Sequence, residues 1–180
     1  MHAPFEAVEV AETRVDGARF DFEAVFRTDY DRIARAIGRV IQDPARAEDL
    51  AVEAFWRLWR TPGAHGASAG AWLHRTAIRL ALDELRRHAR RARYESLMTF
   101  LRPPRTPHDL FSPTQEQGRV RAVLAAMPRR EAELLLLRSD EYSYDDLAKA
   151  LAINAVSVGT LLSRAKQRFR KEYVKRYGEP

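Results

Sequence analysis

Residues 143–170 read SYDDLAKALAINAVSVGTLLSRAKQRFR, and this stretch decides the fold of the second half of the chain. Ser143 predicts a helix start, because it offers a hydroxyl cap with an acid three residues later. Asn154 is placed to cap a second helix at the end of a three-residue turn, 152–154. A short helix, a tight turn and a second helix that starts with small polar residues are typical of a helix-turn-helix.

The second helix of this pair has an outward face suited to duplex DNA. Apolar residues at helical spacing predict that its other face is buried. The outward residues are short near the helix start and basic further along: Val156, Ser157, Thr160, Ser163, Arg164, Gln167, Arg168 and Lys171. Short side chains let the helix start approach a major groove, and basic ones suit the flanking phosphates. The alternative is a helical hairpin that binds no ligand.

Helical patterns continue on the N-terminal side of this motif. Together they predict a second domain over 116–177, with helices at 116–127, 128–139, 143–152 and 155–177. Residues 95–115 hold four prolines and keep no period, which excludes a helix interior and predicts a semi-extended linker.

A first helical domain is expected over 21–94. Apolar residues recur at three- and four-residue steps from Phe22 to Ile41, after an Asp21 cap. Asp43-Pro44 starts a second helix, because Asp is a good cap and Pro suits the first helical position. A small, Gly-rich loop over 61–70 precedes a third helix from about 69 to 93. The fold class is therefore all-α, with two small helical domains joined by a Pro-rich linker.

The amino-acid composition limits the functions that the chain can have. Hydrophobic residues make up 46% of the chain and charged residues 31%, enough for a packed core. There is no cysteine, which excludes disulfides, thiolate zinc sites and cysteine nucleophiles. The five histidines are scattered without metal-ligand spacing, so we expect neither an enzyme nor a cofactor. No secretory signal or membrane-spanning run is visible, and the chain is expected to be cytoplasmic without membrane insertion.

The net charge of +6 is unevenly distributed. Residues 1–31 carry eight acids and three bases, and 1–20 is expected to be an acidic tail. Residues 72–93 carry seven bases and two acids, and residues 164–176 carry seven bases and one acid. Two basic stripes suggest two contacts with one extended polyanion, although each alone could be a solvated helix face.

The stripe in the first domain includes an aromatic residue. Helical spacing puts Trp72, Thr76, Arg79 and Asp83 near one edge, with further arginines alongside. An aromatic ring beside arginines and a flexible loop suits single-stranded DNA, which needs stacking and phosphate neutralisation. An amphipathic helix with a buried Trp is the simpler alternative.

The order of these pieces resembles an extracytoplasmic-function (ECF) sigma factor, a small bacterial RNA polymerase subunit for promoter recognition. The matching stretches are AEDLAVEAFWRLWR (47–60), WLHRTAIRLALDELRR (72–87) and residues 142–170. The resemblance implies a region 2-like domain over 21–94 and a region 4-like domain over 116–177. It also implies that the chain directs transcription initiation and helps to melt promoter DNA.

The resemblance assigns roles to three sets of residues. Core polymerase, through its largest-subunit clamp, would be bound by Glu48, Asp49, Glu53 and Trp56. The −10 element would be recognised and melted by His65, Ser68, Trp72, Arg75, Thr76, Arg79, Asp83, Arg86 and Arg87. The −35 element would be recognised by the outward residues 156–171 given above, while the second domain also touches the polymerase flap. An anti-sigma factor is a further partner that the resemblance allows.

The sequence departs from the family pattern at several positions. Arg79 stands where the family often has Asn, and Ala152 replaces the usual Gly of the turn. The recognition helix opens with 156–161, VSVGTL, in place of the frequent GTVKSR, so a different −35 specificity is expected. Two other functions remain open: a stand-alone helix-turn-helix regulator, and a sigma-like decoy that binds a regulator rather than promoters.

Overall fold

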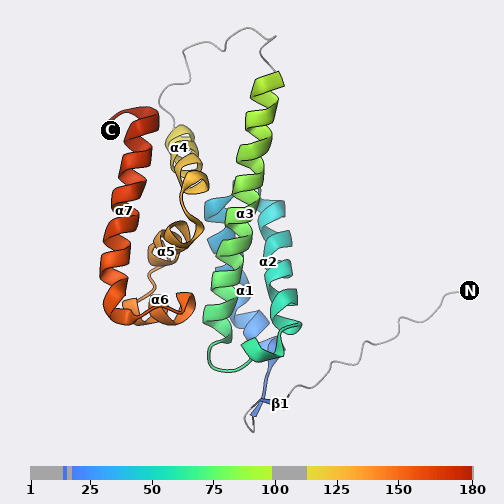
Figure 1. Ribbon diagram of the computed structural model, residues 1–180. Coiled ribbons are helices and arrows are strands. Elements are labelled where there is room, and N and C mark those ends of the chain that lie inside the picture. The colour runs from blue at the N-terminus through green and yellow to red at the C-terminus, as the bar shows by residue number, and fades with distance from the viewer. Residues whose placement is uncertain (1–13, 16–17, 99–112, 180) are drawn as a thin grey trace, which may run out of the picture.

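The computed structural model describes residues 14–15, 18–98 and 113–179, and helices dominate them (Figure 1). In chain order the elements are β1 (Arg14–Val15), β2 (Ala18–Arg19), α1 (Phe22–Val40), α2 (Pro44–Trp59), the 3₁₀ turn η1 (Pro62–Ala64), α3 (Ala69–Met98), α4 (Pro113–Ala126), α5 (Arg129–Ser139), α6 (Tyr144–Leu151) and α7 (Ala155–Tyr177). The predicted all-α class is confirmed.

One small element was not expected. β1 and β2 form a two-stranded antiparallel ladder in which Arg14 pairs with Arg19. The sequence does contain a signal for it, because the intervening Asp16-Gly17 is a dipeptide typical of two-residue hairpins. Of the predicted acidic tail, residues 1–13 and 16–17 lie outside the described residues.

The predicted helix starts are confirmed by capping hydrogen bonds. The carboxylate of Asp21 accepts from the Ala24 amide at 2.9 Å, and that of Asp43 accepts from Arg46 at 3.0 Å. Ser143 Oγ accepts from the Asp146 amide at 3.1 Å, and Asn154 Oδ1 accepts from Val156 at 3.0 Å. Each cap satisfies an amide that the helix itself leaves unpaired.

The limits of the linker differ from the prediction. α3 continues to Met98, and α4 already begins at Pro113 rather than at residue 116. Pro113 fits because the first turn of a helix needs no amide donor from that position. Both ends of the predicted linker, 95–98 and 113–115, are therefore helical, and residues 99–112 lie outside the described residues.

The first domain is a bundle in which α1, α2 and α3 pack on one another. Phe55 lies near its centre with 2% of its surface exposed. Its ring meets those of Phe22, Phe26 and Tyr30 from α1, with centroids 4.8 to 6.3 Å apart. These aromatic contacts fix α2 on α1 and so position the loop and α3 that follow.

The second domain contains the predicted helix-turn-helix. α6 and α7 meet at an angle of 90°, and Leu147, Val158 and Leu162 are buried. Across the part of the chain that the structure describes, no single helix is long and apolar enough to cross a bilayer. Among the described helices, only α6 and α7 taken together, across their bend, reach that length and composition.

The two domains pack against each other along α3. This helix contacts α4, α5 and α6 as well as α1 and α2, and it lies between the two groups of helices in Figure 1. The buried apolar residues of both domains form one continuous cluster, from Ile33 in α1 to Tyr173 in α7. The linker prediction gave no reason to expect so extensive an interface.

The turn between α6 and α7 contains a strained residue. Ala152 has φ 51° and ψ 54°, the left-handed conformation that disfavours any residue with a Cβ atom. Replacing Ala152 with Gly should therefore raise the free energy of unfolding by about 0.5 to 1 kcal/mol, net of the added freedom of Gly in the unfolded chain. Denaturant unfolding measures the change.

A matched substitution lies in the middle of a regular helix. Ala89 is exposed in α3, and Ala89→Gly should lower the free energy of unfolding by about 1 kcal/mol. If both substitutions destabilised the protein equally, the left-handed geometry at Ala152 would be contradicted.

Candidate nucleic-acid interfaces

α7 presents the first candidate interface. All eight side chains predicted to face outward, from Val156 to Lys171, are exposed. Val156 at the helix start is 89% exposed, whereas Val158 and Ala165 on the opposite face are fully buried. The start of the helix is thus exposed on the face that helical periodicity predicted.

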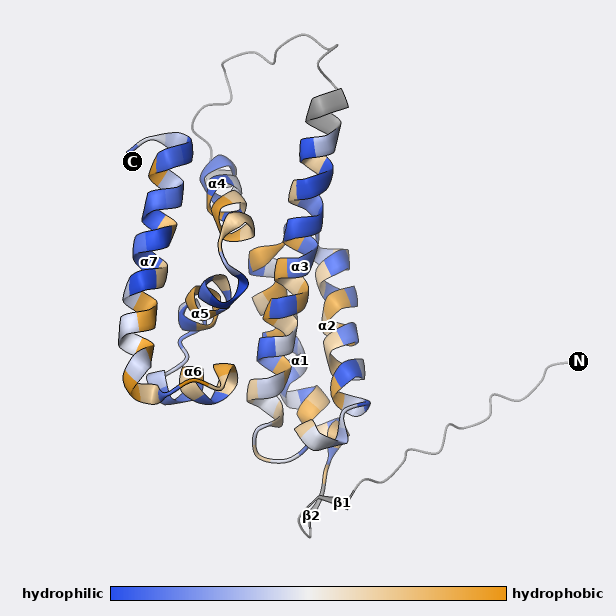
Figure 2. Cartoon of the chain, viewed as in Figure 1, coloured by the Kyte–Doolittle hydropathy of each residue, from blue (hydrophilic) through white to orange (hydrophobic). Residues whose placement is uncertain are grey.

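The basic part of α7 continues this face. Arg164 and Lys171 are exposed, and Arg168 forms an ion pair with Glu131, Nε to Oε2 at 2.8 Å, while its side chain stays 52% exposed. Figure 2 shows that most residues along the second half of α7 are hydrophilic. Cations in this position can neutralise phosphates on either side of a groove.

A groove between α2 and α3 forms the second candidate interface. Its volume is about 490 Å³, and two tryptophans and four arginines line it together with two threonines: Trp56, Arg57, Arg60, Thr61, Trp72, Arg75, Thr76 and Arg79. The Arg60 guanidinium lies over the Trp56 ring, 4.5 Å from its centroid. Such a groove combines stacking surfaces with phosphate-neutralising cations, the combination that binds single-stranded nucleic acid.

Four of the predicted −10 residues thus line one cavity, and sequence reasoning missed Arg57, Arg60 and Thr61. The sequence could have indicated them, because Arg57 follows Trp56 on α2, and Arg60 and Thr61 lie in the turn after that helix. The resemblance assigned Trp56 to polymerase binding, but in the structure its side chain also lines this groove. It is 51% exposed at the edge of the groove.

Other predicted −10 residues lie elsewhere. Ser68 is exposed in the loop before α3, whereas His65 is buried. The His65 ring stacks on Phe20 with centroids 4.1 Å apart, and its Nε2 lies 2.9 Å from the Leu58 carbonyl oxygen. In this arrangement His65 shapes the loop and presents no free face to a base.

Three predicted −10 residues along α3, including Arg79 of the groove, contact the chain itself. Arg79 donates from Nε to Glu133 Oε1 at 3.0 Å, and Asp83 forms an ion pair with Arg129. Arg86 donates to the Met127 carbonyl at 2.9 Å. The partners of all three come from the second domain or its connections.

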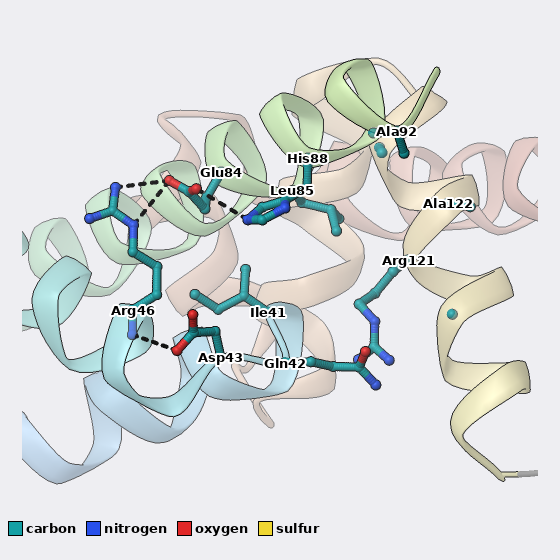
Figure 3. A pocket seen from close by; sticks show the side chains of 13 residues that line it. Ile41, Gln42, Asp43, Arg46, Glu84, Leu85, His88, Ala92, Arg121 and Ala122 are labelled. Carbon is teal, nitrogen blue, oxygen red and sulfur yellow. Dashed lines mark hydrogen bonds and ion pairs between the residues drawn. The ribbon is translucent and has the colours of Figure 1, made fainter. Parts of the chain in front are cut away.

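Arg87 belongs to a charge cluster where α2 begins. Its Nη1 donates to Glu84 at 2.7 Å. Arg46 donates to the same carboxylate at 2.9 Å, as Figure 3 shows. Burial alone would raise the pKa of Glu84, but the Arg46 hydrogen bond and the neighbouring charges outweigh it and hold that pKa below its usual value. The ionised Glu84 therefore ties the start of α2 to α3.

This cluster borders a second cavity of about 500 Å³, between α3, α4 and the connection from α1 to α2. Arg121 points into it from α4, toward Gln42 (Figure 3). Burial lowers the pKa of Arg121, and its Nη2 is buried with no hydrogen-bond partner among the described residues. This part of the interface between the domains is imperfectly packed.

The residues predicted to bind polymerase share an accessible face of α2. Glu48 and Asp49 are exposed, and Glu53 pairs with Arg57 at 2.6 Å while it stays 39% exposed. Val52, which the prediction did not include, is 53% exposed between them. A helix face with accessible acids around an exposed apolar residue is suited to a protein partner.

A three-helix domain with this groove, joined to a helix-turn-helix domain with an open recognition face, defines a two-domain nucleic-acid-binding protein. Residues 25–91 match the model of Sigma-70 region 2, and residues 117–169 match that of Sigma-70, region 4. The chain belongs to the sigma-70 family of RNA polymerase sigma factors and is of the ECF type.

Individual relatives agree with this assignment. The probable RNA polymerase sigma factor RfaY of Xanthomonas campestris pv. campestris is 32% identical over 154 residues, 81% of this chain and 38% of that protein. The ECF RNA polymerase sigma factor SigE of Mycolicibacterium smegmatis is 27% identical over 165 residues, 88% of this chain and 63% of that one. The chain thus spans less than two thirds of each of these two relatives.

A solved structure has a similar fold. It is the sigma factor RpoE in complex with the anti-sigma factor NepR from Bartonella quintana. The TM-score is 0.50 at 17% sequence identity, and the match covers 84% of this chain and 96% of that one.

Proposed function

We propose that this chain is a promoter-specificity subunit that binds core RNA polymerase and directs it to promoters with −10 and −35 elements. The observation that carries the proposal is the groove between α2 and α3, where Trp56 and Trp72 lie among four arginines. A duplex-binding regulator needs only a recognition helix. A protein that also holds a melted strand needs a stacking groove of this kind.

Each surface then has one task. The exposed start of α7 reads the −35 duplex, and its basic part holds the flanking phosphates. The groove accepts unstacked bases of the −10 strand, whose phosphates meet the arginines around it. The accessible face of α2 docks on the polymerase clamp, and the second domain contacts the flap. An anti-sigma factor would compete for these same surfaces.

The chain supplies no catalysis in this proposal. Strand separation uses binding energy alone, because bases held in the groove are no longer available to pair with the opposite strand. Phosphodiester synthesis belongs to the polymerase, so no metal or nucleotide site is required of this chain.

Association with core polymerase tests the proposal directly. Asp49→Asn combined with Glu53→Gln should weaken co-elution with core enzyme about tenfold, because these acids surround the exposed Val52. The matched control is Glu23→Gln with Asp145→Asn, which removes two exposed carboxylates from other surfaces. Wild-type association of the first variant would reject this docking face.

A competing function has a clear signature in the same experiments. A stand-alone helix-turn-helix regulator would bind an isolated duplex site with nanomolar affinity and would ignore core polymerase. If the chain behaved in that way, the proposal would be wrong.

Substitutions in α7 should change the salt dependence of DNA binding. Arg164→Ala and Arg168→Ala should each lower the slope of log affinity against log salt by about 0.9, because each removes one phosphate contact. Titrations with duplex DNA between about 50 and 200 mM salt measure this slope.

Lys175 provides the control, since it is exposed near the end of α7 but outside the predicted contact set. Lys175→Ala should leave the slope within about 0.3 of the wild-type value. Unchanged slopes for both arginine variants would show that α7 does not contact phosphates.

A further inference from the structure

The cavity between α3, α4 and the connection from α1 to α2 has the size of a small-molecule site. Its volume of about 500 Å³ lies within the range of about 300 to 1,000 Å³ that is usual for ligand pockets. Gln42, Ala92 and Gly118 line it and are exposed, so the cavity is open to solvent. Among the described residues, it shares no lining residue with the groove between α2 and α3 or with the predicted DNA-binding face of α7. It is therefore separate from both candidate DNA interfaces.

Small residues on two neighbouring helices leave this space. The lining residues recur at helical spacing, which places them on one face of each helix: Leu85, Ala89 and Ala92 on α3, and Gly118, Ala122 and Ala125 on α4. Because five of these six residues have no side chain larger than a methyl group, α3 and α4 pack on each other without filling the space between them. Ile41, just after α1, adds a buried apolar side chain. These walls suit a hydrocarbon or aromatic body.

The charged side chains of the cavity differ in whether they have partners. Glu84 accepts from Arg46 at 2.9 Å, and its other oxygen lies 3.4 Å from Nε2 of His88. The carboxylate of Asp43 accepts from the Arg46 amide at the start of α2. Arg121 differs from them, because its Nη2 is buried with no hydrogen-bond partner among the described residues while the side chain points into the cavity (Figure 3). An acceptor that reached this atom would remove the cost of burying it.

The chemistry around Arg121 selects the charge of a ligand. Burial lowers the pKa of this guanidinium, and a paired anion would counter that effect. A carboxylate can accept two parallel hydrogen bonds from one guanidinium group. The carboxylates of Glu84 and Asp43 line the same cavity and would repel a second negative charge. A ligand with a single negative charge is therefore favoured over a dianion.

We propose that this cavity binds a small monocarboxylate with an apolar body, whose carboxylate pairs with Arg121 and whose body lies between α3 and α4. The site goes beyond promoter recognition and does not depend on it. Ile41 and α3 belong to the first domain and α4 to the second, so a bound ligand contacts both domains. Binding should therefore also stabilise the folded chain against unfolding.

Calorimetric titration of the full chain tests the site with two carboxylates, the aliphatic octanoate and the aromatic 1-naphthoate. At least one should bind as a single molecule per chain, and the tighter of the two identifies the kind of body that the walls accept. Octanamide has the body of octanoate without its charge and should bind about tenfold more weakly or worse than octanoate. Octyl phosphate, doubly charged at about pH 8, should also bind more weakly than octanoate.

Replacing Arg121 separates the effect of its charge from that of the apolar walls. Arg121→Met keeps a long side chain without the cation, and it should weaken octanoate binding about tenfold or more. Octanamide affinity should change by no more than about twofold, because its contacts with the walls remain. Arg130→Met is the control, since it removes an exposed cation of α5 that does not line the cavity. It should leave octanoate affinity within about twofold of the wild-type value.

Filling the cavity should block both kinds of probe. A Cβ atom at Gly118 would meet nothing within 4 Å, so Gly118→Leu places a larger side chain at the cavity without a clash at its base. The fold should tolerate this change, because Leu is the better helix former. Octanoate and octanamide should both bind about tenfold more weakly or worse. Ala126→Leu adds a similar side chain at an exposed position of α4 outside the cavity and should change neither affinity.

Several results would each overturn the inference. These are dissociation constants above about 1 mM for both carboxylates, equal affinity for octanoate and octanamide, or octanoate binding that Arg121→Met or Gly118→Leu leaves unchanged. Tighter binding of octyl phosphate than of octanoate would reject the monocarboxylate. Failure of the chain to associate with core polymerase would instead reject the proposed function and leave this site intact.

Discussion

Replacing Trp72 with alanine should weaken binding of a dT₁₂ single strand by about 10- to 100-fold. Stacking of a base on an aromatic side chain contributes about 1 to 3 kcal/mol, and each 1.4 kcal/mol corresponds to a factor of ten. Trp72 lines the groove with Arg75 and Arg79, and it lies near the start of α3, where a strand can approach from the loop. Fluorescence anisotropy at fixed salt measures the change.

Two further variants distinguish a loss of base stacking from a loss of folding. Trp72→Phe keeps an aromatic face and should lose no more than about threefold in affinity. Trp56→Ala should lose about tenfold, because Trp56 lines the same groove yet is 51% exposed, which limits the cost to the fold. If Trp72→Ala bound dT₁₂ as tightly as wild type, the groove would not be the strand-binding site.

Replacing Phe55 with alanine should have the largest effect on stability. Its ring is 2% exposed and contacts three aromatic rings of α1. Removing a buried Phe side chain leaves a cavity and costs about 3 to 5 kcal/mol of unfolding free energy. The corresponding fall in melting temperature is roughly 10 °C for a chain of this size.

Val52 provides a control on the same helix, three residues earlier. It is 53% exposed, and Val52→Ala should change the free energy of unfolding by no more than about 0.5 kcal/mol. A loss below about 1 kcal/mol for Phe55→Ala in denaturant unfolding would contradict the packing of α2 on α1.

Local rules predicted the helices well. Asp21, Asp43, Ser143 and Asn154 were each identified as caps, and each accepts the expected amide. A cap involves residues only two or three positions apart, so sequence alone contains the information. Pro113 was misjudged because a proline at the start of a helix resembles one in a linker.

The interface between the domains could not be predicted in the same way. Glu133 lies in a run of apolar residues on α5, and nothing nearby in the sequence identifies Arg79 as its partner. The cluster of His74, Asp140 and Tyr142 likewise joins residues more than 60 positions apart. Such contacts depend on how whole helices pack, and the proline-rich segment pointed instead to two separate domains.

In the candidate sites, exposure along one helix could be predicted from the sequence, whereas contacts between different elements could not. The outward face of α7 follows from helical periodicity, and all eight predicted residues are exposed. The family resemblance assigned His65 to the −10 set, but tertiary packing places Phe20 against its ring. Arg57, Arg60 and Thr61 join the groove because α2 and α3 lie side by side there, which a pattern along one helix cannot show.

The most direct test is transcription reconstituted from core RNA polymerase, the purified chain and fragmented genomic DNA of the source organism. We expect discrete transcripts whose 5′ ends map downstream of shared −35 and −10 sequences, formed only when chain and core are both present. Asp49→Asn with Glu53→Gln should reduce these transcripts, and the Glu23→Gln/Asp145→Asn control should not. No transcript above the level of core enzyme alone would contradict the assignment of this chain as a promoter-specificity subunit.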